Sequence, residues 1–129
     1  MINDFDITAI EDEVKGILRG LGVSQKIYSN RPKAADSASD FVVAMVSGDI
    51  QDMSTYGECM LSVYLFAKDV DNMKNGKKLS AMYQKVRRGF PASSGRLLFD
   101  VFPSIGRDIP DDFGYHRRQI RIQVTIKAI

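Results

Sequence analysis

Near the middle of the chain, apolar residues fall on both sides of one long stretch, Tyr56 to Asp69. In an extended backbone, neighbouring side chains point to opposite faces. One face therefore carries Leu61, Val63, Leu65 and Ala67, and the other carries Met60, Ser62, Tyr64 and Phe66. Because both faces are largely apolar, the pattern predicts a central strand that is covered on both sides.

Two other stretches have the 3.6-residue periodicity of an amphipathic helix. The first lies near the N-terminus, with its apolar stripe at Ile7, Ile10, Val14, Ile17, Leu18 and Leu21. The second follows the central strand, with its stripe at Leu79, Met82, Tyr83, Val86 and Phe90. We expect both helices to pack on a sheet, either on one face or one on each face, which the pattern leaves open.

The first helix carries residues that favour a defined start and end. Asp6 and Thr8 are equal candidates for its N-cap, and Thr8 has Glu11 at capping-box spacing. Gly22 is expected to end it in a left-handed conformation, with Val23 packing on the last apolar turn.

The second helix has two candidate N-caps, Asp71 and Asn75, between which the sequence does not decide. Arg87 and Arg88 suit the negative end of the helix dipole, and Gly89 followed by Pro91 is expected to stop the helix.

Shorter apolar stretches predict the remaining strands, at 26–28, 41–46, 97–102 and 119–129. The last of these alternates, with Ile120, Ile122, Val124 and Ile126 facing inward. We expect a turn at 29–32 and loops at 33–40, 47–54, 91–95 and 103–114. The strand 41–46 and the central strand are expected to form a hairpin with a protruding tip.

Together these elements predict an α+β fold in which residues 1–129 form a single domain. The expected sheet is mixed, mostly antiparallel and of about five strands, packed with two helices in the order α-β-β-β-α-β-β. The chain has 129 residues, 44% of them apolar and 26% charged, which is enough to build one core without cross-links.

The sequence contains few signals of compartment or export. Its lone cysteine, Cys59, excludes an internal disulfide and is compatible with a reducing environment. No apolar run approaches the roughly 18 residues of a membrane span, and the start, Met1 to Asp6, is acidic, unlike a signal peptide. We therefore expect the protein to be used in the cytoplasm where it is made.

The search for catalytic or metal-binding residues is largely negative. His116 is the only histidine, with Asp111 and Asp112 nearby in sequence, and a surface histidine is the favoured interpretation over a catalytic one. Cys59 falls on the core face of the central strand, which favours a buried, inert thiol. The stretch Asp69 to Ser80 fails the spacing of a calcium loop, and a solvated loop is favoured over a cation site for Asp108, Asp111 and Asp112. Gly16, Gly20 and Gly22 do not form a dinucleotide fingerprint.

Charge is unevenly distributed although the net charge is only +2. No acidic residue occurs from Asn72 to Phe99, whereas basic residues are frequent there. Four of them lie opposite the apolar stripe of the second helix: Lys77, Lys78, Lys85 and Arg88. Such a face contacts phosphates or an acidic protein surface, or it is simply the solvated side of the helix.

Several local patterns, taken in order, resemble the tail terminator (tail completion) proteins of long-tailed bacteriophages and prophages. An amphipathic helix precedes Lys26-Ile27-Tyr28, and Arg31-Pro32 precedes the apolar strand Phe41-Val42-Val43. The long strand ends in Leu65-Phe66-Ala67-Lys68-Asp69, a helix with Leu79 and Val86 follows, and Gly114-Tyr115-His116 opens the closing strand. The likeness extends from Asp6 to Ile129, with departures at the short tip Asp49 to Met53 and at the basic second helix.

The resemblance implies a structural protein of the virion that has no catalytic residue, cofactor or metal. Copies would join head-to-tail into a closed ring, expected to be a hexamer. The ring would cap the tail tube and join it to the head, so its partners would be the tail tube protein and a head or neck protein. DNA would pass through the channel without sequence-specific binding, and no membrane would be involved. The protein would reside in the virion tail or neck after synthesis in the bacterial host cytoplasm.

Two sets of surface residues are candidates for these contacts. The hairpin tip would contact a neighbouring subunit or the tube through Asp49, Ile50, Asp52, Met53 and Tyr56. A second hypothesis pairs the acidic start of the first helix (Asp4, Asp6, Glu11 and Asp12) with the basic face (Lys77, Lys78, Lys85 and Arg88) of a neighbour.

Two other classes of protein stay open at the level of sequence. A small nucleic-acid-binding module would use the basic helix, residues 74–88, and would bind duplex DNA in a strongly salt-dependent way. An enzyme of ferredoxin-like architecture would need a polar pocket beside His116.

Overall fold

The computed structural model describes residues 6–30, 38–111 and 113–128. The described residues form an α+β fold of one mixed, mostly antiparallel sheet and two helices. The elements are, in chain order, α1 (Ile7–Gly20), β1 (Ile27–Tyr28), β2 (Asp40–Val46), β3 (Gln51–Asp52), β4 (Tyr56–Lys68), α2 (Gly76–Gly89), β5 (Ala92–Ser94), β6 (Leu97–Ile105), β7 (Ile109–Pro110) and β8 (Tyr115–Lys127). The predicted fold class is confirmed, and the predicted order of elements is matched except for three short strands.

The long strand singled out in the sequence, β4, lies inside the sheet, whose order is β1-β2-β4-β8-β6-β5. All 13 residues of β4 pair antiparallel with the 13 residues of β8. The predicted hairpin with β2 is confirmed, in a register that runs from Asp40 opposite Ala67 to Val46 opposite Leu61. β1 joins the far side of β2 as a parallel strand, which makes the sheet mixed.

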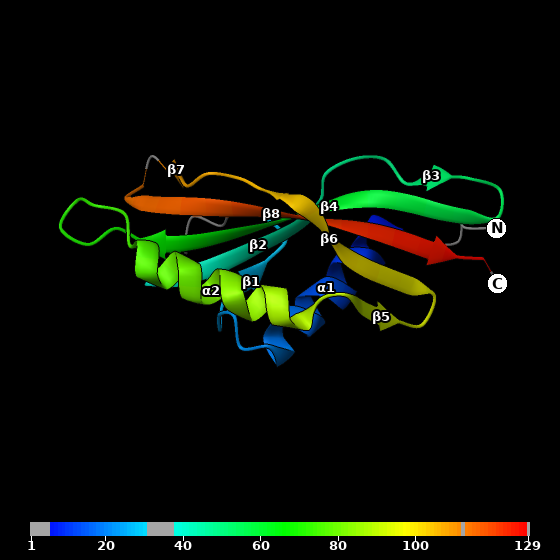
Figure 1. The fold of residues 1–129 in the computed structure, drawn as a ribbon, viewed down its shortest axis with the longest axis horizontal. Helices are drawn as coiled ribbons and strands as arrows, with labels where there is room; N and C mark the ends of the chain where they lie inside the picture. The colour runs from blue at the N-terminus through cyan, green and yellow to red at the C-terminus, as the bar shows by residue number, and fades with distance from the viewer. Residues whose placement is uncertain (1–5, 31–37, 112, 129) are drawn as a thin grey trace.

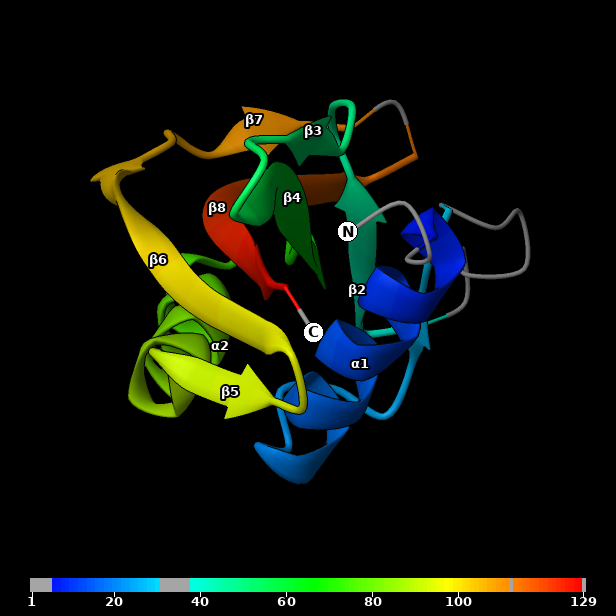
Figure 2. The ribbon, with the colours of Figure 1, turned by 90° about the vertical axis from the view of Figure 1, so that its right-hand side faces the viewer.

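Both helices lie on the same face of the sheet, as Figures 1 and 2 show. The buried side chains of α1 are Ile10, Val14 and Leu18, and those of α2 are Leu79, Met82 and Val86. All six belong to one core cluster with Leu61, Val63 and Leu65 of β4 and the inward-facing row of β8. The question left open by the sequence is thereby settled in favour of one covered face.

The other face of the sheet carries only a small apolar cluster and no helix within the described residues. Phe41 stacks on Phe66 with ring centroids 4.4 Å apart, and the hydroxyl of Tyr115 donates a 2.5 Å hydrogen bond to the carbonyl oxygen of Ala38. Further along β4, Met60 and Tyr64 are only half-buried. The prediction that both faces of this strand are covered therefore holds at Ser62 and Phe66, which are buried, and is wrong at Met60 and Tyr64. Tyrosine and methionine read as apolar in a sequence pattern, but both tolerate partial exposure.

The helix ends form as their residues predict. The carboxylate of Asp6 caps α1 by accepting a 2.7 Å hydrogen bond from the backbone N–H of Ala9. Gly22 has φ of 68°, and its N–H and that of Val23 donate to the carbonyls of Arg19 and Leu18, which is a Schellman motif. The sequence left two candidate N-caps open for α1, Asp6 and Thr8, and Asp6 is the residue that caps the helix.

At α2, Asn75 is the N-cap rather than Asp71. Asp71 and Asn72 have φ of 53° and 63° instead, at the centre of a tight turn that is closed by hydrogen bonds between Val70 and Met73. Turn chemistry, rather than calcium coordination, thus accounts for this stretch, as the sequence favoured.

Three short strands and some strand ends differ from the sequence-based expectation. The expected loops 47–54, 91–95 and 103–114 contain β3, β5 and β7, and β6 continues past Pro103 to Ile105 with a register shift after Val101. Strands of two or three residues have no measurable periodicity, so only pairing with a neighbour reveals them. Parts of some predictions lie outside the described residues, namely residues 31–32 of the predicted turn 29–32, residues 33–37 of the predicted loop, Asp4, Asp112 and Ile129.

Candidate interaction surfaces

The tip of the β2–β4 hairpin forms an arm that extends beyond the helices (Figure 1). We define the arm as residues 47–60, in which β3 folds back on the start of β4 with Gln51 opposite Glu58 and Asp52 opposite Gly57. Its turn is ordered by hydrogen bonds from the N–H of Met53 to the carbonyl of Tyr56 and from the N–H of Ser54 to the carboxylate of Asp52. The arm is thus built as β structure rather than as an irregular loop.

The five tip residues chosen from the sequence do not all point outward. Met53 and Tyr56 are 43% and 38% exposed, which is high for large apolar side chains. Asp49 and Asp52 are exposed as well. Ile50 differs, because it is half-buried and packs against the main core, where it anchors the arm to the domain.

The arm is acidic, since residues 47–67 include Asp49, Asp52 and Glu58 and no lysine or arginine. Glu58 is half-buried and accepts a 3.4 Å hydrogen bond from the side-chain amide of Gln123. The two aspartates of the tip therefore carry most of the exposed negative charge of the arm.

The predicted basic face of α2 is exposed, but half of it makes contacts within the chain. The ammonium of Lys78 pairs with the carboxylate of Asp40 at 2.9 Å, and that of Lys85 donates a 3.2 Å hydrogen bond to the carbonyl of Gly22. Lys77 and Arg88 are exposed. The face thus divides into two lysines turned toward the start of β2 and the end of α1, and two basic residues turned to solvent.

The two turned lysines line a polar cleft of about 860 Å³ between α2, the end of α1 and the start of β2. Its charged lining residues are Arg19, Lys26, Asp40, Lys78 and Lys85. Among the described lining residues Asp40 is the one carboxylate, and it pairs with Lys78 and accepts a hydrogen bond from the hydroxyl of Ser24 at 2.5 Å, so these residues carry an excess of positive charge. We call this the basic cleft.

Sequence reasoning did not find the basic cleft as a site. Lys78 and Lys85 were identified from the helical pattern, but Arg19, Lys26 and Asp40 come from other elements. No spacing in the sequence relates these three residues to α2, because only the packing of both helices on one face brings them together.

The acidic start of α1 offers less free charge than its sequence suggests. Asp6 is the helix cap, and Glu11 accepts a 2.8 Å hydrogen bond from the backbone N–H of Val46 at the end of β2. Asp12 pairs with Lys15 at 3.2 Å. These carboxylates have partners within the chain, which weakens the hypothesis that they meet the basic face of a neighbour.

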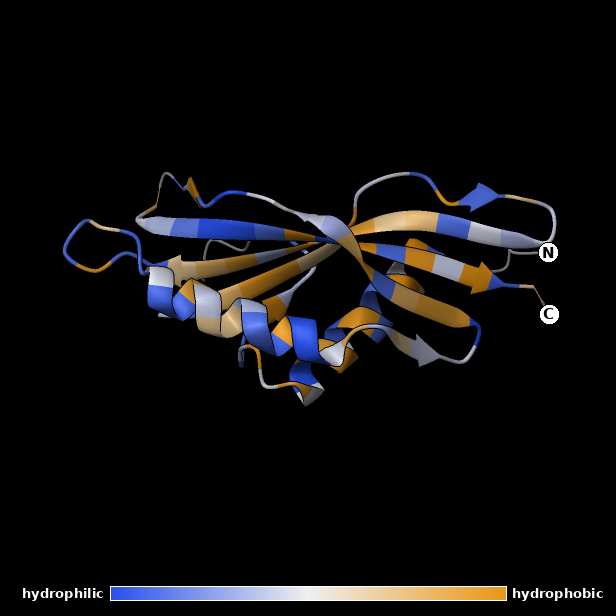
Figure 3. Ribbon diagram, in the orientation of Figure 1, coloured by the Kyte–Doolittle hydropathy of each residue, from blue (hydrophilic) through white to orange (hydrophobic). Residues whose placement is uncertain are grey.

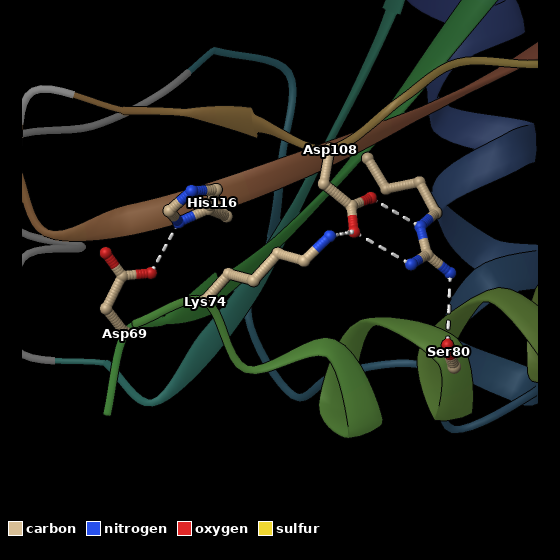
Figure 4. A network of polar contacts seen from close by, with 6 residues as sticks. Asp69, Lys74, Ser80, Asp108 and His116 are labelled. Atoms are coloured by element: carbon tan, nitrogen blue, oxygen red, sulfur yellow. Dashed lines mark hydrogen bonds and ion pairs between the residues drawn. The ribbon is translucent and has the colours of Figure 1, made fainter. Parts of the chain in front are cut away.

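A second polar network holds the β6–β7 connection against α2 (Figure 4). The guanidinium of Arg118 binds both carboxylate oxygens of Asp108, at 2.7 and 2.9 Å, and donates to the hydroxyl of Ser80 at 3.3 Å. Lys74 adds a third contact to Asp108 at 3.1 Å. The hydrogen bonds from Arg118, followed by those from Lys74, lower the pKa of Asp108 to about 2. Asp108 is thus part of an ion-pair network, and its carboxylate is not the free cation ligand that the sequence raised as a possibility.

His116 pairs with an acid that the sequence did not suggest. Its Nδ1 lies 2.7 Å from the carboxylate of Asp69, which directly follows β4 (Figure 4). The backbone N–H of Asp111 donates to the carbonyl of Tyr115. Acyl-transfer chemistry would also require a nucleophile beside the imidazole. The polar partner that the described residues give the imidazole is this carboxylate, not a serine, threonine or cysteine.

Cys59 packs in the main core, as predicted, and burial raises its pKa to about 11, which disfavours the reactive thiolate. Among the described residues, no group of three or more His, Cys, Asp or Glu side chains is placed to hold a metal ion. No helix in residues 6–30, 38–111 and 113–128 has the length and apolarity needed to cross a membrane.

Comparison with known proteins adds no assignment. The sequence matches no protein-family model and no curated protein sequence.

Proposed function

We propose that the protein is a virion structural protein, a tail terminator that forms a ring, caps the tail tube and joins it to the head or neck. The proposal starts from the order of sequence patterns that resemble this family. It is supported by surfaces on the fold that suit assembly.

The observation that carries the proposal is the arm. Its exposed Tyr56 begins β4 and Met53 lies just before it, whereas β8 pairs with β4 along its whole length and β2 pairs with the half that is farther from the tip. A rigid base with an exposed apolar tip suits binding to another protein, because burying the tip in a partner removes apolar surface from water. The favourable free energy of such burial is about 25 cal/mol for each Å² of apolar surface removed from water.

A terminator has to contact different proteins on its two sides, and exposed apolar residues gather at both ends of this molecule. Opposite the arm, the loop between β4 and α2 exposes Val70 and Met73, at 56% and 71% (Figure 1). The neighbouring β7–β8 region exposes Ile109 and Phe113, and the N–H of Asp69 donates to the carbonyl of Gly114, which ties the two segments together. Two such surfaces on one small domain support a linking role.

The alternative, a nucleic-acid-binding module that uses residues 74–88, has less support. Lys74, Lys78 and Lys85 already contact acceptors within the chain, at Asp108, Asp40 and the carbonyl of Gly22. Any anionic partner of these lysines, a phosphate backbone or an acidic peptide, would have to compete with these acceptors. A duplex-DNA titration at low salt tests this alternative, which predicts binding that weakens steeply as salt rises.

The proposed function is tested by adding the purified protein to the tail tube protein encoded in the same genome while tubes assemble. We expect shorter tubes, each with a ring at one end in negative-stain images. The control is the variant Met53→Asp/Tyr56→Asp, which places charges on the arm without touching the buried core, and which should leave tube length unchanged. Tubes of unaltered length with the unmodified protein would exclude a terminator role.

A further inference from the structure

We propose that the basic cleft is the receptor for the arm of a second copy of this chain, so that copies join arm-to-cleft. The inference deepens the proposed function, because it names the surfaces through which copies would associate. It rests on that function only for the requirement that copies associate. It names the two surfaces that meet: the acidic tip around Asp49 and Asp52, and the cleft between α1 and α2.

The first argument is charge. The described residues that line the cleft include four cationic side chains from three segments of the chain, Arg19, Lys26, Lys78 and Lys85, against the one carboxylate of Asp40. The arm has only acidic charges, with Asp49 and Asp52 exposed at its tip. In a chain with a net charge of only +2, this separation gives two complementary surfaces, which steer association and fix its orientation.

The second argument is the chemistry of the cleft. Besides cations, it contains acceptors, namely the carbonyl of Gly22 and the carboxylate of Asp40. A peptide carries carboxylates for the lysines and backbone N–H groups for these acceptors. The phosphates of a DNA backbone offer only acceptors and would be repelled by the same oxygens. The mixed lining therefore favours a protein segment over nucleic acid.

The third argument is distance. Asp40, in the cleft, lies opposite Ala67, whereas β3 of the arm lies opposite Gly57 and Glu58 of the same strand. These positions are ten residues apart along β4, which is roughly 33 Å at about 3.3 Å per residue. An arm cannot reach the cleft of its own chain. The contact has to join unlike surfaces of different copies, and repeated contacts of this kind close into a ring when the rotation allows it.

The experiment uses carbodiimide cross-linking, which joins a carboxylate directly to an amine, in a mixture of ¹⁴N- and ¹⁵N-labelled protein. We expect peptide pairs of mixed isotope that link Asp49 or Asp52 to Lys26, Lys78 or Lys85. Assembly should fall about tenfold or more when the cleft is reversed by Lys26→Glu/Lys85→Glu, or the tip by Asp49→Lys/Asp52→Lys. Combining both reversals in one chain should restore assembly, with cross-links now running from tip lysines to cleft glutamates.

The matched control is Lys77→Glu/Arg88→Glu, which makes the same charge change on α2 outside the cleft and should leave the cross-links in place. Asp49→Lys alone keeps the Asp52–Ser54 turn contact intact, which guards against misfolding of the arm. Cross-links from the tip to other lysines, or protection of the cleft lysines by a short DNA duplex in place of a second copy, would overturn the inference. Ring-sized particles without arm-to-cleft links would overturn it and leave the proposed function standing. Arm-to-cleft links together with tail tubes of unaltered length would support the inference and exclude the proposed terminator function.

Discussion

At the scale of single residues, Asp108 and Arg118 form a bidentate ion pair, with hydrogen bonds of 2.7 and 2.9 Å. The side chains of both are mostly buried, with 6% and 16% exposed. The pKa of Asp108 in the native state is about 2, below its ordinary value of 3.8. The native state therefore binds a proton on this carboxylate less readily than the unfolded chain does. The carboxylate therefore stabilises the fold above about pH 4, and that contribution disappears as the pH falls toward 2.

The variant Asp108→Asn tests this. It should lower the free energy of unfolding by about 1–2 kcal/mol at pH 7, allowing for screening of a network close to the surface. The deficit should shrink as the pH falls from 4 toward 2, because the unmodified protein then loses the same contribution. Urea unfolding followed by circular dichroism measures both.

Asp100→Asn is the matched control, since Asp100 is an exposed aspartate on β6. It should change stability by less than about 0.5 kcal/mol at every pH. An Asp108→Asn deficit that stayed constant down to pH 2 would show that the ionised carboxylate is not its source.

At the scale of elements, the end of α1 depends on the left-handed conformation of Gly22, with φ of 68°. Gly22→Ala places a Cβ in a conformation that L-residues adopt at a cost, so it should destabilise the protein by about 1 kcal/mol. Gly16→Ala, within the same helix, has open space around the added Cβ and should instead stabilise the protein by about 0.5–1 kcal/mol.

The stability changes of the two glycine variants are expected to have opposite signs because the backbone conformations of the two glycines differ. The thermal unfolding midpoints of both variants measure these changes. Equal shifts of the two midpoints in the same direction would mean that the C-terminal turn of α1 is not formed as described.

The elements also mark how far the sequence could predict this fold. Helices and long strands were predictable because they repeat their pattern over many residues, as in Ile120 to Ile126. Strands β3, β5 and β7 were not, since pairs such as Gln51 and Asp52 become a strand only by pairing with β4. The sequence also left open whether the two helices pack on the same face of the sheet. An apolar stripe shows that one side of a helix is buried, but it does not show which face of the sheet buries it.

The candidate surfaces follow the same rule. The tip and the basic side of α2 each lie within one continuous stretch of the chain and were identified from the sequence. The basic cleft, the Asp108–Arg118 pair and the His116–Asp69 pair each join segments distant in sequence. Figure 3 shows the patterns that could be predicted, since apolar residues follow the strands and alternate with polar residues along α2.

At the scale of the whole molecule, the protein is a sheet covered by helices on one face, with an acidic arm beyond one end and a basic cleft near the other. Unlike surfaces held apart by a rigid strand favour head-to-tail association over a symmetric dimer. A closed ring uses every arm and every cleft, whereas any open chain leaves one of each exposed.

The central claim, a closed ring of copies, is tested most directly by native mass spectrometry of the unmodified protein over a series of rising concentrations. We expect a discrete assembly at six times the 14.4 kDa of one chain, with few intermediates, because closure satisfies the last arm and cleft together. A mass that stays at one chain up to the solubility limit, or that stops at a dimer, would contradict it.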